Sequence, residues 1–242
     1  MQSVISLQHL SKKIGKSDIL KDISLALHSG EVFGFLGPNG AGKTTTMKAI
    51  LGIIEPTSGV VEILGKSPRD TRVQQKIGFM PENTYLYKYL TGDEFLDFNG
   101  NFYGLLSEKL EEKKIWALEK VGLTEARGKR LNTYSKGMLQ RIGLAQAILH
   151  DPDIIFLDEP MSGLDPIGRK LVKDLMLELK AARKTIFFNT HILSDVETIC
   201  DSFGIICEGR LVANMKIGDL DIPLEDFFMQ KIAENSTRNH LG

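Results

Sequence analysis

The chain has 242 residues, of which 42% are hydrophobic and 25% charged, which excludes a disulfide-stapled miniprotein, a disordered chain and a fibrous repeat. Thirty Lys and Arg residues against 31 Asp and Glu residues give a formal net charge of -1, so the overall charge does not favour a nucleic acid as partner. Cys200 and Cys207 do not belong to a metal-binding motif, and we expect them to be small buried side chains rather than a disulfide.

Short runs of β-branched and aromatic residues recur along the chain and are typical of buried strands. They cover residues 4–8, 22–27, 32–37, 59–64, 76–80, 154–159, 185–189 and 203–207. Residues 168–182 place Leu171, Leu175 and Leu179 four apart, which indicates an amphipathic helix between two buried strands. This alternation predicts an α/β fold. No window approaches the roughly 18 uninterrupted apolar residues of a spanning helix, so we expect a chain that neither crosses a membrane nor is exported.

Helical patterns replace the strand-like runs between Pro81 and His150, and they indicate an inserted helical segment. They cover residues 91–104, 107–123 and 137–150. The first part of this segment is rich in aromatic residues: Tyr85, Tyr87, Tyr89, Phe95, Phe98, Phe102 and Tyr103. Packing in a core and a groove for a partner both explain such a cluster, because interfaces are also enriched in aromatic side chains.

A glycine-rich loop at residues 37–44 follows the apolar run VFGFL and precedes the helical pattern TTTMKAIL. This strand, loop and helix context is what a phosphate-binding loop requires. The glycines allow backbone N–H groups to ring the phosphates, and the helix adds its positive end. We expect Lys43 to reach the β- and γ-phosphates and Thr44 to take a Mg²⁺ coordination position, assisted by Thr45. The predicted loop consists of Gly37, Pro38, Asn39, Gly40, Ala41, Gly42, Lys43 and Thr44.

Two adjacent carboxylates end the apolar run IIFLDE, and the carboxyl ends of strands are where ligands bind in α/β sheets. Neighbouring residues on a strand point in opposite directions, so the two groups are expected to differ in role. We expect Asp158 to hold Mg²⁺ directly or through water. Glu159 is placed to polarise the water that attacks the γ-phosphate.

From about Ile5 to Phe228 the chain resembles the ATP-binding cassette proteins, in which such a loop and acidic strand flank a helical subdomain. Further motifs match in order. YSKGMLQR at residues 134–141 takes the place of the family's signature, SGLD at residues 162–165 matches its D-loop, and His191 matches its switch histidine. Together these motifs are far more specific than the phosphate loop alone.

The resemblance implies a P-loop NTPase core with a mostly parallel, RecA-like sheet, an antiparallel β subdomain and an inserted α-helical subdomain. It also implies a single ATPase domain over residues 1–242. Residues 1–80 and 151–219 would form the nucleotide-binding core, residues 81–150 the helical subdomain that carries the signature, and residues 220–242 a C-terminal tail.

In that family two cassettes pair head to tail, and each ATP lies between the phosphate loop of one and the signature of the other. The resemblance therefore implies that Ser135 and Gly137 contact the nucleotide of a second subunit. Ser135 can also cap the helix that starts near Gly137, which creates an anion site. His191 is expected to contact the γ-phosphate as a catalytic residue, and Asp165 to couple the two composite sites.

Some residues depart from the family's pattern. Ile14 stands where an aromatic side chain usually stacks on adenine, which removes the stacking contribution. Glu82 replaces the usual Q-loop glutamine, which keeps an oxygen ligand for Mg²⁺ or water and adds a negative charge. Lys136 and Met138 replace the first glycine and the glutamine of the signature.

The resemblance implies an ATP-hydrolysing subunit with ATP and Mg²⁺ as cofactors, bound peripherally on the cytoplasmic side of a membrane. It would pair with a second ATP-binding subunit and drive a separate permease, and the motif variants resemble those of exporter subunits for drugs, polysaccharides or lipids. The alternative is an ATPase of the same superfamily that acts on ribosomes or DNA, although no nucleic acid is expected. A kinase or GTPase would leave YSKGMLQR unexplained. Cargo, direction and a homo- or heterodimeric pairing stay open.

Overall fold

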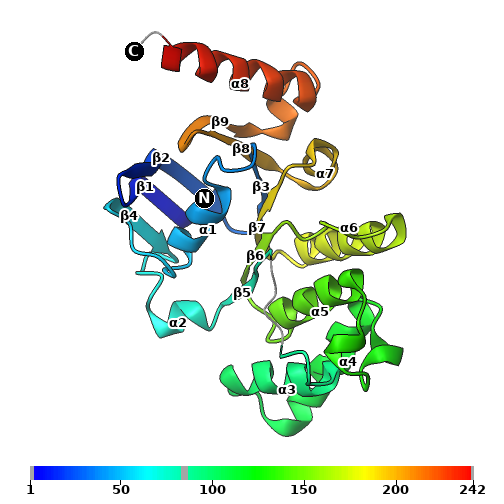
Figure 1. The fold of residues 1–242 in the computed structure, drawn as a ribbon. Coiled ribbons are helices and arrows are strands. Elements are labelled where there is room, and N and C mark those ends of the chain that lie inside the picture. The colour runs from blue at the N-terminus through cyan, green and yellow to red at the C-terminus, as the bar shows by residue number, and fades with distance from the viewer. Residues whose placement is uncertain (1–2, 83–86, 241–242) are drawn as a thin grey trace. The chain divides into compact units, whose positions relative to one another are not determined.

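The structure, a computed structural model, describes residues 3–82 and 87–240, with side chains described as far as Asn235. The chain divides into two compact units (Figure 1). The first unit contains Met1–Gln74 and Thr185–Gly242, and the second contains Gln75–Lys184. The sequence predicted other boundaries, with residues 151–184 grouped with the nucleotide-binding core, and that functional division stays a prediction.

An antiparallel sheet forms one part of the first unit, as expected. Its strands are β1 (Ser3–Ile14), β2 (Ser17–His28) and β4 (Ser58–Ile63), in the order β2-β1-β4. Ile14 pairs with Ser17 across a tight turn, in which Gly15 adopts a left-handed φ of 59°. Apolar residues alternate with polar ones along β2, so that one face of this strand is buried and the other is exposed.

A second group of strands in the first unit runs in the order β7-β3-β8-β9. These strands are β7 (Thr185–Thr190), β3 (Val32–Leu36), β8 (Ser202–Cys207) and β9 (Arg210–Lys216). The first three are parallel and fully buried, whereas β9 is antiparallel to β8. The rings of Phe33, Phe35 and Phe187 pack together with centroid separations of 5.5 to 6.3 Å. The helices of this unit are α1 (Lys43–Ile50), α2 (Thr71–Gln74), α7 (Leu193–Ile199) and α8 (Leu224–His240).

The second unit combines two parallel strands with most of the helices predicted from the sequence. Its strands β5 (Ile77–Met80) and β6 (Ile154–Asp158) pair in register, with Met80 opposite Leu157. Its α-helices are α3 (Gly92–Phe102), α4 (Ser107–Lys120), α5 (Lys136–Ile148) and α6 (Pro166–Ala181). The α/β fold with parallel strands, the antiparallel sheet and the inserted helices were all predicted, and the structure confirms them.

Helix α5 lies as close to strand β5 as two backbones can. A Cβ atom on Gly78 would lie 1.9 Å from the carbonyl oxygen of Ala147, a distance that no side chain could accommodate. His150, just beyond α5, donates a hydrogen bond of 3.0 Å from Nε2 to the carbonyl of Ile77. Its ring stacks on Tyr103 at 3.5 Å between centroids. These contacts fix α5 against the strand.

An ionic network joins α3 to α4. The ammonium group of Lys114, which is 3% exposed, lies 2.7 Å from Asp97, 2.7 Å from Glu111 and 3.1 Å from Asp93. Burial by itself would lower the pKa of Lys114, but hydrogen bonds to the three carboxylates outweigh it and raise the pKa above its usual range. Arg127 adds contacts of 2.6 and 2.7 Å to Asp93 and Glu111.

Two further sequence-based expectations concern the cysteines and membrane-spanning helices. Cys200 and Cys207 are both buried and do not form a disulfide, as predicted. Within residues 3–82 and 87–240, no helix has both the length and the apolar character needed to cross a membrane. The sequence reading did not anticipate β9, α7 or α8.

Candidate functional site

The phosphate loop joins β3 to α1 in the first unit, as the sequence predicted. The Lys43 ammonium group donates hydrogen bonds to the carbonyls of Gly37, at 2.7 Å, and Pro38, at 3.3 Å. The loop therefore curls around its own lysine. Gly42 has a φ of 112°, and Gly37 leaves no room for a side chain because an added Cβ would lie 2.3 Å from the carbonyl of Ile206.

Polar groups and a helix end surround this loop. Thr44 and Thr45 are half-buried at the start of α1, and their contacts with a bound phosphate or its metal ion stay predictions. Pro38, Asn39 and Gly40 are exposed, whereas Ala41 is buried. The arrangement can surround an anion with backbone N–H groups and one ammonium group.

His191 lies at the same edge of the first unit's parallel strands as the phosphate loop. Thr190, the last residue of β7, pairs with Leu36, the last residue of β3. His191 and Gly37 are the next residues along each strand. His191 is exposed, and the hydroxyl of Thr190 accepts a hydrogen bond of 3.1 Å from the N–H of Ile192, which shapes the turn. The position agrees with the predicted γ-phosphate contact, which stays a prediction.

Ile14 lies at the tip of the β1–β2 hairpin and is exposed. The same hairpin reaches the phosphate loop, because a Cβ on Gly42 would lie 2.8 Å from the Leu20 side chain of β2. Ile14, which takes the place of the family's adenine-stacking residue, therefore belongs to a hairpin that packs against the phosphate loop. Its contact with a base stays a prediction.

The two adjacent carboxylates end strand β6 in the second unit. Asp158 is 2% and Glu159 8% exposed, and Glu159 has a left-handed φ of 52°. The side-chain amide of Gln140 donates a hydrogen bond of 2.9 Å to the backbone carbonyl of Glu159. Because Met80 pairs with Leu157, Asp158 at the end of β6 and Glu82 just after β5 lie at the same edge, and Glu82 is exposed there. The unit therefore gathers the three predicted acidic residues.

Ser135 begins helix α5 as its N-cap, which confirms the capping prediction. Its hydroxyl accepts a hydrogen bond of 3.2 Å from the N–H of Met138. Ser135 is exposed, and Gly137 lies half-buried in the first turn, so the positive end of α5 is open to an anion. The Lys136 side chain, which replaces the first signature glycine, reaches the backbone turn at Gly163.

Asp165 is a helix cap as well as a D-loop residue. Its carboxylate accepts a hydrogen bond of 2.8 Å from the N–H of Gly168 at the start of α6, where Pro166 occupies the first turn. The sequence predicts only the coupling role for Asp165, and the helix cap is a second role. Asp165 is exposed.

Mg²⁺ binding requires oxygen ligands, and the predicted ligands fit that need: the Thr44 hydroxyl and the carboxylates of Asp158 and Glu82. Among the residues described, no group of three or more His, Cys, Asp or Glu side chains is arranged to hold a metal ion. In nucleotide sites, phosphate and water oxygens supply most of the ligands of Mg²⁺. The donor set therefore fits a metal that arrives with its nucleotide.

The aromatic segment of the sequence divides into two parts. Phe95 is buried in the core and Tyr103 stacks on His150, whereas Tyr85 lies outside the described residues. Four aromatic side chains, which we call the aromatic patch, are 42 to 74% exposed and follow one another with ring centroids 5.0 to 5.9 Å apart. The aromatic patch consists of Tyr87, Tyr89, Phe98 and Phe102.

Two contacts near the site were not predicted. One is the hydrogen bond from Gln140 to Glu159, for which the burial of a polar residue within YSKGMLQR is the available signal. The other is the hydrogen bond of 3.0 Å from the N–H of Gly209 to the carbonyl of Ala41, which ties the β8–β9 turn to the phosphate loop. The sequence carries no evident signal for the second.

Comparisons with known proteins agree with this geometry. The family model described as ABC transporter matches residues 20–162. An uncharacterized ABC transporter ATP-binding protein of Nostoc sp. is 50% identical over 203 residues, which cover 83% of this chain and 61% of that protein. The bacitracin transport ATP-binding protein BcrA of Enterococcus faecalis is 39% identical over 223 residues, covering 91% of this chain and 71% of that protein.

A solved structure is also similar. The ATP-binding subunit of an ABC transporter superposes with a TM-score of 0.87 at 30% identity, over 95% of this chain and 99% of that one. The chain spans about three fifths of the length of the Nostoc relative, 61%. The family model covers more than half of the chain, and the motif resemblance is confirmed. The chain belongs to the ABC transporter family, among its ATP-binding proteins.

Proposed function

We propose that the chain binds ATP with Mg²⁺, hydrolyses it, and so drives a separate membrane permease from its cytoplasmic side. The observation that carries the proposal is the phosphate loop, in which Lys43 is held by the carbonyls of Gly37 and Pro38. The relatives described as ABC transporter ATP-binding proteins support the coupling to transport.

The proposed mechanism assigns one task to each residue. Lys43 and the backbone N–H groups of the loop would bind the β- and γ-phosphates, and His191 would contact the γ-phosphate. Glu159 would accept a proton from the attacking water as general base. Mg²⁺, held by Thr44 and Asp158, would neutralise charge that develops on the phosphate oxygens.

Replacing Lys43 by alanine is expected to weaken ATP binding by about 10- to 100-fold, because a charge-assisted hydrogen bond contributes roughly 1.5 to 3 kcal/mol. Isothermal titration with a non-hydrolysable ATP analogue measures the change. Lys48→Ala, at an exposed lysine of the same helix, is the matched control and should bind normally. Unchanged affinity in Lys43→Ala would count against the phosphate-loop assignment.

The second subunit and the permease are also part of the proposal. Ser135, Gly137 and Asp165 are exposed or half-buried at helix starts, where a second copy or a related subunit could complete each nucleotide site. Export as the direction rests on the resemblance to exporter subunits, and one relative is named for bacitracin transport. ATPases that act on ribosomes or DNA are the competing class, and the formal net charge of -1 gives them no support.

The aromatic patch is our candidate for the surface that receives a permease helix. Tyr87→Ala combined with Phe98→Ala should lower permease binding by about tenfold or more, because exposed aromatic side chains carry much of the binding energy at interfaces. The measurement is the amount of membrane partner that co-purifies with the tagged protein from detergent-solubilised native membranes in the presence of Mg·ATP.

The control for this experiment is the pair Ile115→Ala and Leu177→Ala, which removes two other exposed apolar side chains of the same unit. That variant should retain its partner. If the doubly substituted aromatic patch retains a stoichiometric membrane partner in a folded protein, the patch is not the docking surface. Co-purification of ribosomes or DNA instead of a membrane protein would favour the competing class.

A further inference from the structure

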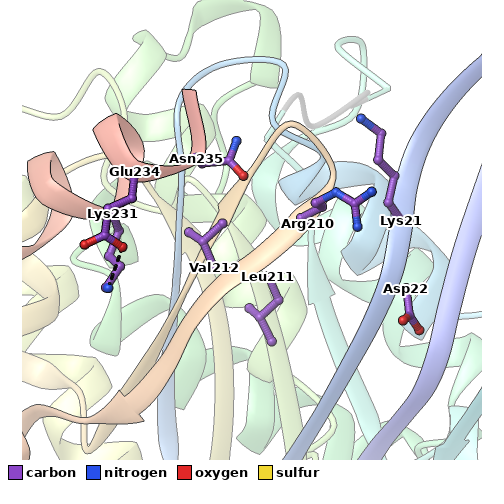
Figure 2. Close-up of a pocket in the computed structure, with 8 residues that line it drawn as sticks. All are labelled: Lys21, Asp22, Arg210, Leu211, Val212, Lys231, Glu234 and Asn235. Carbon is purple, nitrogen blue, oxygen red and sulfur yellow. Dashed lines mark hydrogen bonds and ion pairs between the residues drawn. The ribbon is translucent and has the colours of Figure 1, made fainter. Parts of the chain in front are cut away.

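A pocket of about 470 Å³ lies in the first unit, apart from the phosphate loop (Figure 2). Strands β2 and β9 and helix α8 line it, with Lys21 on β2, Arg210 at the start of β9 and Asn235 on α8. Its volume falls in the range of about 300 to 1,000 Å³ that is typical of small-molecule sites. None of the family motifs described above includes its residues.

The charges in this pocket are not balanced. Of its two carboxylates, Glu234 pairs with Lys231 at 2.8 Å, and Asp22 lies 2.7 Å from His9. Lys21 and Arg210 form no ion pair with any residue that the structure describes. Two positive side chains are therefore left without a carboxylate partner on the wall that β2 and β9 share.

Backbone geometry brings these two cations together. The N–H of Lys21 donates a hydrogen bond of 2.7 Å to the carbonyl of Gly209, the residue before Arg210. A Cβ on Gly209 would lie 2.3 Å from the carbonyl of Ile19, so only glycine permits this approach. Lys21 and Arg210 thus extend from adjoining backbone positions, and Figure 2 shows both beside the same turn.

The rest of the lining suggests the shape of the ligand. Leu211 and Val212 are half-buried and apolar, and Asn235 is buried with its amide 3.4 Å from the sulfur of Cys207. Two adjacent cations match a phosphate, which carries a charge of about -1.5 to -2, better than a carboxylate of charge -1. We propose that this pocket binds a small organic phosphate, with its phosphoryl group on Lys21 and Arg210 and its carbon body on Leu211 and Val212.

Gly209 links the wall of the pocket to the phosphate loop. The carbonyl of Gly209 accepts the hydrogen bond from the N–H of Lys21. The N–H of Gly209 donates a hydrogen bond of 3.0 Å to the carbonyl of Ala41 in the phosphate loop. A phosphate that fixes Lys21 and Arg210 therefore restrains the turn that supports the loop. This part of the inference rests on the proposed function: an occupied pocket should raise nucleotide affinity several-fold, because the loop is then ordered before nucleotide binds.

The test uses glycerol 3-phosphate as the probe. It is titrated calorimetrically into the full chain saturated with AMP-PNP and Mg²⁺, so that the phosphate loop cannot bind the probe. Lys21→Ala combined with Arg210→Ala should weaken probe binding at least tenfold. Lys66→Ala combined with Lys216→Ala removes the same charge from exposed positions of the same unit and should leave binding unchanged. Circular dichroism melts verify that both variants are folded.

A parallel arm distinguishes a free phosphate from a lipid headgroup. Vesicles containing phosphatidylglycerol replace glycerol 3-phosphate, and phosphatidylcholine vesicles serve as the neutral reference. If a probe binds and its binding is lost only in the Lys21 and Arg210 variant, the proposed phosphate site is supported. The probe that binds shows whether the phosphate comes from a free molecule or from a lipid headgroup. If neither probe binds, or if binding is equal in the two variants, the inference is overturned.

The dissociation constant of AMP-PNP, measured with and without the probe, tests the coupling. An unchanged constant when the probe is bound would overturn the link through Gly209. Failure to bind AMP-PNP at all would instead overturn the proposed function. The probe titration of the nucleotide-free chain would then still decide whether the pocket binds phosphate.

Discussion

Glu159→Gln is expected to lower steady-state ATP hydrolysis by a factor of about 10² to 10⁴ while ATP binding persists, because a carboxamide keeps the shape of the side chain but cannot accept a proton. Hydrolysis is followed by phosphate release, and binding by titration with ATP in the same protein. A large fall in turnover without a matching loss of affinity is the signature of a group that acts only in the chemical step.

The surroundings of Glu159 make this substitution structurally mild. The hydrogen bond from Gln140 reaches the backbone carbonyl of Glu159 and does not depend on its side chain. The left-handed φ of 52° is equally available to glutamic acid and glutamine. Glu112→Gln, at an exposed position on α4, is the matched control and should hydrolyse ATP at the wild-type rate. Wild-type turnover in Glu159→Gln would remove Glu159 from the role of general base.

Lys114→Met is expected to lower the free energy of unfolding of the second unit by about 2 to 3 kcal/mol. It removes the cation that three carboxylates share, and only Asp93 and Glu111 then keep a cation, Arg127. The estimate lies below the value for a fully buried pair, since Asp93, Asp97 and Glu111 have side chains that are 28 to 46% exposed and thus partly solvated. Urea denaturation of the full chain measures the loss, and hydrogen exchange of the α3 and α4 amides locates it.

The control is Lys170→Met, which breaks an exposed ion pair with Asp174 one turn along α6. That change should alter stability by less than about 0.5 kcal/mol, as is usual for such pairs. Equal effects of the two substitutions would show that the Lys114 network stabilises no more than a surface pair does. An effect on turnover without any loss of stability would point away from a structural role for Lys114.

The parts of the fold that the sequence predicted are those whose signals are local. The run VFGFL, the glycines of residues 37–44 and the helical pattern after them are adjacent in the chain, and β3, the loop and α1 follow them. Strand β9 was missed because its residues are mostly half-buried or exposed, so that its sequence RLVANMK shows neither a continuous apolar run nor a clean alternation. Helix α7 has only seven residues, which is too short for a periodic pattern to emerge.

In the candidate site, too, the sequence predicted the features that depend on neighbouring residues and missed a contact between residues far apart in the chain. Ser135 as a cap follows from its place before a helical pattern, and the structure confirms it. Parallel pairing within each unit explains two sets of positions: Glu82 and Asp158 share an edge in the second unit, and His191 shares an edge with the phosphate loop in the first. The support of Glu159 by Gln140 spans 19 residues and depends on how α5 packs, so the polar residue within YSKGMLQR does not by itself identify its partner.

The contact between Gly78 and helix α5 has a mechanical consequence. Because the carbonyl of Ala147 occupies the space of a side chain on Gly78, α5 cannot slide along or tilt away from β5 without losing its closest contact. Ser135 is at the start of α5, and Glu82 follows the end of β5. We therefore expect a displacement of Ser135 to move β5, the strand that leads to Glu82, together with α5 as one rigid body.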